Sequence, residues 1–241
     1  GIPVSPAVGD LNADGSPEIV VATGAGLIFA LDRSGATLWE REIGGTSPSW
    51  STSAPVIFGA SDGSARVVAG SSSGWVFCLD GVTGDVLWKN PTCGPIASTI
   101  SVGDPDLDGR ADIFLITQLG VIYRYDEEGT ELCQIDMQGR SLASGSILDV
   151  NSDGRPEYVF STQQGHLMVL DHSGDVLFDY QFPNRTTNST PIFGDMTKSS
   201  PGLEMLIPGG ESGKIFCFKT PAKTDTLIQW GAYRCTPDMK A

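Results

Sequence analysis

The sequence predicts an all-β protein, a five-bladed β-propeller of four-stranded antiparallel blades, and three observations lead to this fold class. Five segments of the 241-residue chain align with one another at a spacing of roughly 45 to 50 residues, which is the spacing of propeller repeats. Each segment holds short β-branched runs bounded by Gly, Asp and Ser, and none keeps a helical period over three turns. Glycines and aromatic residues recur at the same places in the units.

The aligned segments define the expected blades and their order. We place these blades at about 5–52, 53–98, 99–144, 145–189 and 190–233, followed by a tail over 234–241. One four-stranded sheet cannot bury both of its faces, whereas radial stacking of such sheets can. Five whole units favour a closed ring and a single domain. A larger ring that contains these units is the alternative, and the nearly constant in-line repeat disfavours a sandwich.

Within each unit, four elements follow one another in a fixed order. A short apolar run, such as "PAV" in the first unit, precedes an acidic, glycine-bearing loop, and a β-branched run such as "EIVVAT" comes next. A third run ends in an aspartate in four units, at Asp32, Asp80, Asp126 and Asp171. These aspartates precede tight turns and are expected to cap backbone amides. The last strand is marked by Trp39, Trp88, Phe178 or Trp230, which we interpret as packing between blades.

Composition excludes two classes of partner. The formal net charge is −14, from 29 acidic and 15 basic residues, and the chain has no Lys/Arg cluster of the kind that phosphate groups need, so we expect no nucleic-acid binding. No apolar run approaches the roughly 18 residues of a membrane helix, so we expect no direct membrane insertion. Of the five cysteines, Cys93 and Cys235 lie in expected loops, and whether they pair stays open.

Three acidic loops follow one pattern, D-x-[D/N]-x-D-G-x-x-[D/E]. Oxygen ligands at alternating positions, with a glycine that allows a sharp turn, suit a hard cation such as Ca²⁺, which takes six to eight oxygens. We therefore predict about three calcium sites, with Ser16, Arg110 and Arg155 contributing backbone carbonyls. The expected ligands are Asp10, Asn12, Asp14, Ser16 and Glu18; Asp104, Asp106, Asp108, Arg110 and Asp112; and Asp149, Asn151, Asp153, Arg155 and Glu157.

These loops differ from an EF-hand, because the closing carboxylate comes at position 9 and position 12 lies inside a strand. The loops, their place between the first two strands and "IFGD" at 192–195 resemble the FG-GAP or VCBS-type repeats of integrin-like propellers. "LDGVTGDVLW" at 79–88 resembles the tryptophan-docking repeat of quinoprotein propellers. The first resemblance implies calcium that stiffens the blades. Units two and five depart from the pattern, and we expect no calcium there; Arg66 would supply a cation in unit two.

No arrangement of residues predicts catalysis. Neither histidine has a metal partner at a useful spacing, no G-x-S-x-G elbow is present, and the acids belong to loops and turns rather than to a facing pair. We expect no cofactor besides calcium. The connections between units carry hydroxyls together with four candidate ligand-binding residues, Trp50, Arg140, Asn184 and Arg185. Such side chains suit a glycan or a peptide, although Ser and Thr there also satisfy backbone groups.

These observations favour a non-enzymatic, calcium-stabilised binding or adhesion module that recognises a glycan or a protein partner. We expect it outside the cytoplasm, as an extracellular, periplasmic or cell-surface protein, because loops of this kind suit millimolar calcium. Two alternatives stay open. One is a polysaccharide-active enzyme, a lyase or glycosidase, with two close carboxylates facing the axial funnel. The other is a scaffold that docks a neighbouring domain or subunit through an exposed apolar patch.

Overall fold

The computed structural model describes residues 1–2, 4–43, 53–137, 139–182, 189–196, 202–208, 213–223, 226 and 228–230. These residues form twenty β-strands arranged in five antiparallel sheets, with no helix among them. The predicted all-β class of five antiparallel sheets is therefore confirmed. Within the same residues, nothing forms a helix of the length and apolarity that crossing a bilayer requires.

The first four units each form a sheet in which consecutive strands are neighbours. The first two sheets contain β1 (Ala7–Gly9), β2 (Glu18–Ala22), β3 (Leu27–Leu31) and β4 (Thr37–Glu42), then β5 (Val56–Gly59), β6 (Ala65–Gly70), β7 (Trp75–Asp80) and β8 (Val86–Pro91). The next two contain β9 (Ser101–Gly103), β10 (Asp112–Ile116), β11 (Val121–Tyr125) and β12 (Glu131–Asp136), then β13 (Ser146–Leu148), β14 (Glu157–Ser161), β15 (His166–Leu170) and β16 (Val176–Gln181).

The fifth sheet has three strands, β17 (Ile192–Gly194), β18 (Glu204–Pro208) and β19 (Ile215–Lys219). The expectation that the fifth unit supplies its own fourth strand, marked by Trp230, is wrong. The last strand, β20 (Ile228–Trp230), pairs instead with β13 of the fourth sheet. Its Gln229 also accepts a hydrogen bond from the Asp104 amide at 2.8 Å, which ties β20 to the loop after β9.

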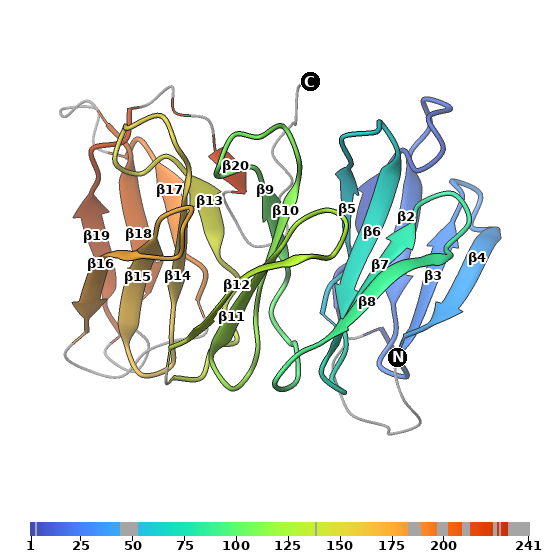
Figure 1. Cartoon of the computed structure of the whole chain (residues 1–241), viewed down its shortest axis with the longest axis horizontal. Helices are drawn as coiled ribbons and strands as arrows, with labels where there is room; N and C mark the ends of the chain where they lie inside the picture. The colour runs from blue at the N-terminus through green and yellow to red at the C-terminus, as the bar shows by residue number, and fades with distance from the viewer. Residues whose placement is uncertain are drawn as a thin grey trace.

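The sheets follow one another as an arc (Figure 1). The first sheet lies at one end of the longest axis and the fifth at the other, with β9 and β13 between them. Inner strands of successive sheets are in contact, β1 with β5 and β9 with β13. As far as the described residues go, the five sheets do not close the expected ring, because the first and fifth sheets lie at opposite ends instead of side by side.

Three apolar clusters lie between neighbouring sheets. One joins the first sheet to the second, one joins the second, third and fourth, and one joins the fourth to the fifth. Two tryptophans close the outer parts of the first junctions: the Trp39 Nε1 donates to the Gly81 carbonyl at 2.8 Å, and the Trp88 Nε1 donates to the Glu127 carbonyl at 2.9 Å. Trp39 thus anchors the first sheet on the second and Trp88 the second on the third, in the packing role that the sequence predicts for them.

Candidate functional site

The three acidic loops share one backbone conformation. The fourth position of each loop has a positive φ, at Ala13, Leu107 and Ser152, and the glycine two residues later has one as well. The first carboxylate accepts hydrogen bonds from the amides of the fifth and sixth positions; for Asp104 both distances are 3.0 Å. Each loop therefore closes on its own first aspartate.

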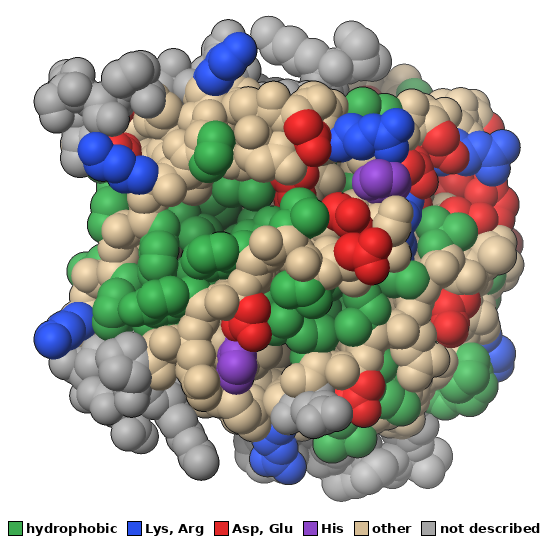
Figure 2. Space-filling model, turned by 60° about the vertical axis from the view of Figure 1, so that its left-hand side comes forward, with side chains coloured by type: hydrophobic (Ala, Val, Ile, Leu, Met, Phe, Trp, Pro, Cys, Tyr) green, Lys and Arg blue, Asp and Glu red, His purple; other side chains and the backbone are tan. Residues whose placement is uncertain are grey.

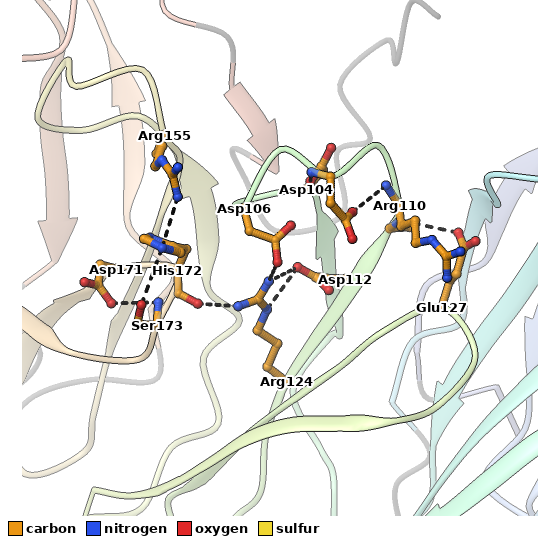
Figure 3. Close-up of polar contacts among 12 residues, drawn as sticks. Asp104, Asp106, Arg110, Asp112, Arg124, Glu127, Arg155, Asp171, His172 and Ser173 are labelled. Atoms are coloured by element: carbon orange, nitrogen blue, oxygen red, sulfur yellow. Dashed lines mark hydrogen bonds and ion pairs between the residues drawn. The ribbon is translucent and has the colours of Figure 1, made fainter.

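The loop after β13 gathers three acids with no cation of its own among them. Carboxylate oxygens of Asp149, Asp153 and Glu157 lie within 4.8 Å of one another. Glu157 is buried and accepts a hydrogen bond from the Val150 amide at 2.7 Å. Burial, together with the charges of the neighbouring Asp153 and Asp149, raises the pKa of Glu157 to about 7. The Arg155 side chain turns away to His172, at 3.1 Å (Figure 3).

The loop after β9 is divided between two sets of partners. Asp104, Asp106 and Asp108 form a second acidic cluster within 4.8 Å, and burial raises the pKa of Asp104. Asp112, which we expected to close this cage, is buried against the guanidinium of Arg124, whose Nε lies 2.9 Å from the Asp112 Oδ2. Figure 3 shows the same guanidinium reaching Asp106 and the His172 carbonyl. The positively charged side chain of Arg124 therefore lies between Asp112 and Asp106.

Arg124 is a residue that the sequence reasoning missed. Burial works against its charge, but the hydrogen bonds and charge of Asp112, together with Asp106, raise its pKa above the ordinary value. A signal was present, because Arg124 takes a strand position that is apolar in the other intact units. Its cross-strand partner is Phe114, whereas the corresponding pairs are Val20 with Ala30 and Val159 with Val169.

The first loop holds its predicted ligands close to its own backbone. The Asp14 Oδ1 accepts from the Ser16 amide at 2.7 Å, and the buried Glu18 accepts from the Leu11 amide at 2.8 Å. Among the described residues, the clusters of three or more acidic groups within 4.8 Å are those of the other two loops. The acidic groups of the first loop are therefore the least closely gathered of the three loops.

The second unit carries its own positive charge in place of the closing acid. The Arg66 Nη2 lies 3.3 Å from the Asp62 Oδ2, and its Nη1 donates to the Glu127 carbonyl at 2.6 Å. The Glu127 carboxylate reaches back from the third unit to accept from the Ser61 amide at 2.9 Å. In the fifth unit, the substituted positions Thr197, Lys198 and Ser199 lie outside the described residues.

The predicted ligand-binding residues do not assemble into one described site. Trp50, Asn184 and Arg185 lie outside the described residues. Arg140 is exposed on the connection between the third and fourth sheets, where its carbonyl accepts from the Gln163 amide at 2.8 Å. The glycan-binding or peptide-binding role of these four residues stays a prediction.

An apolar groove opens between the fourth and fifth sheets, and sequence reasoning did not find it. At the place of Trp39 and Trp88, the fourth sheet has Phe178, which is 41% exposed, whereas Trp39 is 7% exposed. The groove has a volume of about 290 Å³. We call it the Phe178 groove; its lining is Val150, Asn151, Val169, Leu177, Phe178, Met205, Phe218, Lys219, Thr220 and Pro221.

The phenylalanine in the Phe178 groove is smaller than a tryptophan and has no N–H to donate across the junction. The Phe178 and Phe218 rings meet edge to face, with centroids 6.5 Å apart. Figure 2, which brings this side of the molecule forward, shows hydrophobic side chains gathered in a hollowed area. The fourth junction is thus open at its outer part, where Phe178 takes the place of a tryptophan.

Sheet order, tryptophan contacts and comparisons together define the class of protein, a β-propeller of quinoprotein-type repeats. The family model that matches residues 24–201 is described as outer membrane protein assembly factor BamB. The match spans most of the chain, so the chain belongs to this family. The expected membership of the FG-GAP or VCBS family is wrong. An acidic loop is a local turn that many hairpins can carry, whereas the tryptophan contacts determine how neighbouring sheets pack.

Solved structures show the same fold at low sequence identity. A rhamnogalacturonan lyase of Bacillus licheniformis has 20% identity and a TM-score of 0.66, over 95% of this chain and 50% of the lyase. BamB of Moraxella catarrhalis has 18% identity and a TM-score of 0.54, over 91% and 65%. BBS1N, solved in complex with ARL6DN, has 14% identity and a TM-score of 0.62, over 91% and 66%.

The chain spans about half the length of the lyases that it resembles. No curated protein matches it.

Proposed function

We propose that this chain is a non-catalytic propeller module that binds a protein partner through the Phe178 groove. The groove itself is the observation that carries the proposal, because a partly open apolar junction between two packed sheets accepts large side chains. Membership of the BamB family supports a role in outer-membrane protein assembly, in the periplasm. The similarity to BBS1N in complex with ARL6DN supports partner binding by a propeller of this kind.

The lining of the Phe178 groove indicates what the partner would present. Val169, Met205 and Phe218 form an apolar floor, while Asn151 and Lys219 stand at its polar end. A partner segment with an aromatic or leucine side chain would fill the floor and exclude water. The proposed partner is therefore a protein segment with an apolar anchor.

The partner-binding proposal is tested by co-purification from the bacterial envelope. We expect Phe178→Asp to lose at least ~90% of the protein partner that the wild type retains, because a buried charge without a counter-ion is costly. Leu38→Asp is the matched control, since Leu38 is 49% exposed on an outer strand away from the groove. Equal retention by both variants would contradict the proposal.

The lyase neighbours define the test of the enzyme alternative. The proposal predicts that the purified chain leaves rhamnogalacturonan intact. The measurement is ultraviolet absorbance, which should show no accumulation of the unsaturated product of a lyase reaction. Cleavage that disappears on substitution of an acidic residue would replace the binding proposal with a catalytic one.

We also propose that calcium stabilises two of the acidic loops. The donor set fits, because the 149–157 and 104–112 loops gather carboxylates, which are the ligands that calcium prefers. The pKa of Glu157 is raised first by burial and then by the charges of Asp153 and Asp149, and a divalent ion bound there would favour the charged carboxylate. Asp149, Asp153 and Glu157 would hold one ion, and Asp104, Asp106 and Asp108 the other; Asp112 faces Arg124 instead.

Calorimetric titration with calcium, paired with thermal melts in calcium and in EDTA, tests this second proposal. We expect about two ions, dissociation constants of roughly 10⁻⁴ to 10⁻³ M, and a higher Tm in calcium. Glu157→Gln should remove one ion, whereas the control Asp32→Asn, in a turn outside these loops, should retain both. An unchanged Tm and no binding heat would refute the assignment.

A further inference from the structure

In the third unit, the Arg124 side chain fills the junction beside an acidic loop. Its guanidinium contacts the closing acid Asp112, then Asp106 at the third position of the loop, and the His172 carbonyl on the next sheet (Figure 3). Arg124 is 6% exposed, and these acceptors satisfy its buried charge. The loop and the neighbouring sheet thus direct oxygen atoms at one cation.

The fourth unit keeps the surrounding positions but lacks the arginine. Val169 takes its place in the cross-strand pairs, while Glu157 is the closing acid and Asn151 holds the third position of the loop. Glu157 is 2% exposed and accepts from the Val150 amide at 2.7 Å. Within the part of the chain that the structure describes, no ion pair joins Glu157 to a lysine or an arginine. This buried carboxylate therefore lacks the cation that its counterpart in the third unit has.

The Phe178 groove lies at the corresponding place of the next junction. Val169 and Asn151 both line the groove. From the fifth unit, Thr220 lines it at the position that His172 has in the fourth unit, counted from the turn glycine of each unit. The positions that surround the arginine in one junction thus border an open groove in the next.

Asn151 connects the groove with the buried acid. Its side-chain amide donates to the Glu157 Oε1 at 2.8 Å and to the Asp153 Oδ2 at 2.9 Å. Lys219 also lines the groove, but its cross-strand neighbour is the buried Glu204, the closing acid of the fifth unit. A guanidinium that enters from the groove would replace the neutral amide donor at Glu157 with a charged one, which forms the stronger hydrogen bond.

We propose that the partner segment in the Phe178 groove carries an arginine beside its apolar anchor, and that this arginine pairs with Glu157 as Arg124 pairs with Asp112. The inference rests on the proposed function, because it specifies the partner of the same groove. Arginine suits the place better than lysine, since Arg124 uses three nitrogens on three different acceptors and an ammonium group is a point charge. The net charge of −14 also favours a basic segment.

Two fluorescent synthetic peptides test the inference by fluorescence anisotropy with the whole chain. One is Gly-Ser-Phe-Ser-Arg-Ser-Gly, in which the two large side chains share one face of an extended segment, and the other has glutamine in place of arginine. The titrations are made in EDTA, because the proposed calcium ion would compete for Glu157. We expect the arginine peptide to bind about tenfold more tightly or more, since a charged donor at a carboxylate is stronger than a neutral one.

Variants of two loop residues should change this preference in opposite directions. Glu157→Gln should abolish the preference and leave the affinity for the glutamine peptide unchanged, which shows that the groove is intact. Asn151→Asp supplies the acid that the third unit has at Asp106, and it should tighten binding of the arginine peptide by roughly threefold or more. The control Asp32→Asn, between β3 and β4, should keep the wild-type preference.

The inference and the proposed function fail in different ways. Equal affinity for the two peptides that Phe178→Asp abolishes would overturn the arginine and leave the groove as the partner site. The same conclusion follows if the preference survives Glu157→Gln. It also follows if neither peptide binds while the wild type, unlike Phe178→Asp, captures its partner from the bacterial envelope. Peptide binding that Phe178→Asp leaves unchanged, or the absence of both peptide binding and partner capture, would overturn both proposals.

Discussion

At the scale of single residues, Glu127 links the second and third units. Its carboxylate is buried and accepts from the Ser61 amide at 2.9 Å and from the Ala111 amide at 3.4 Å. Burial alone would raise the pKa of Glu127, but the hydrogen bonds from Ser61 and Ala111, with the charge of Arg66, outweigh burial and lower the pKa below its ordinary value of 4.5. The charged form of Glu127 therefore contributes to stability.

We predict that Glu127→Gln destabilises the protein by about 1–3 kcal/mol at neutral pH, because the amide group cannot accept all of these hydrogen bonds. The folded-state pKa lies below the unfolded one, so the contribution of Glu127 is complete above the unfolded value. It is lost as the pH falls through the lowered folded pKa. Urea denaturation of both proteins across pH measures this.

The difference between wild type and Glu127→Gln should thus shrink below pH 4.5. Glu128→Gln is the control, because Glu128 is exposed and pairs with Arg110 at 3.2 Å at the surface. Such a pair contributes at most about 1 kcal/mol. A difference for Glu127→Gln that does not depend on pH would contradict this account.

The residue scale also shows the limit of prediction from the sequence. The spacing of the acidic loops correctly indicated a repeated turn, because the pattern is local and the glycine positions determine it. The partners of Asp112 could not be predicted in the same way. Arg124 reaches Asp106 and Asp112 across the β10–β11 pair of its own sheet, and it reaches the His172 carbonyl only after the fourth sheet packs against the third. The spacing within the acidic loop encodes neither contact.

At the scale of elements, a glycine turn receives the tryptophan ring of the preceding sheet. Gly129 has a φ of 85°, and a Cβ added there would lie 2.6 Å from the Trp88 ring. Gly35 has a nearly identical φ of 84° in a turn with open space around it. A comparison of substitutions at these two glycines therefore separates the cost of backbone strain from the cost of contact with the neighbouring sheet.

We predict that Gly35→Ala costs about 1–2 kcal/mol, the cost of a left-handed conformation with a Cβ. Gly129→Ala should cost a further ~1–3 kcal/mol, because Trp88 must move from its place on the Glu127 carbonyl. Urea denaturation measures both losses of unfolding free energy, with m-values that should equal the wild-type m-value. Equal costs at the two sites would mean that the tryptophan contact does not stabilise the junction.

The strand order within the first four units followed from the sequence, since alternating runs and turn glycines specify neighbouring antiparallel strands. The position of β20 did not follow from the sequence. Residues 225–230 align with the outer strands of earlier units, yet Ile228–Trp230 pairs with β13. Three residues of strand pattern do not determine which sheet edge they join, and the contact of Gln229 with Asp104 depends on the packed structure.

At the scale of the whole molecule, the number of repeats was predictable and the closure of the ring was not. Each unit specifies its own hairpins and the face that it presents to the next unit. Closure depends on the rotation between successive sheets, which the repeat pattern does not contain. The open arc and the Phe178 groove are both features of the junctions between sheets, which the pattern of one unit does not specify.

The central claim, that the Phe178 groove binds a protein partner, is tested most directly by photo-crosslinking in intact cells. A photoreactive residue at Leu177 lines the groove, and one at Leu38 is the matched control at the same place in the repeat. The two side chains are 50% and 49% exposed. We predict a discrete crosslinked envelope protein from Leu177 and none from Leu38. Identical patterns from both positions, or no product from Leu177, would contradict the claim.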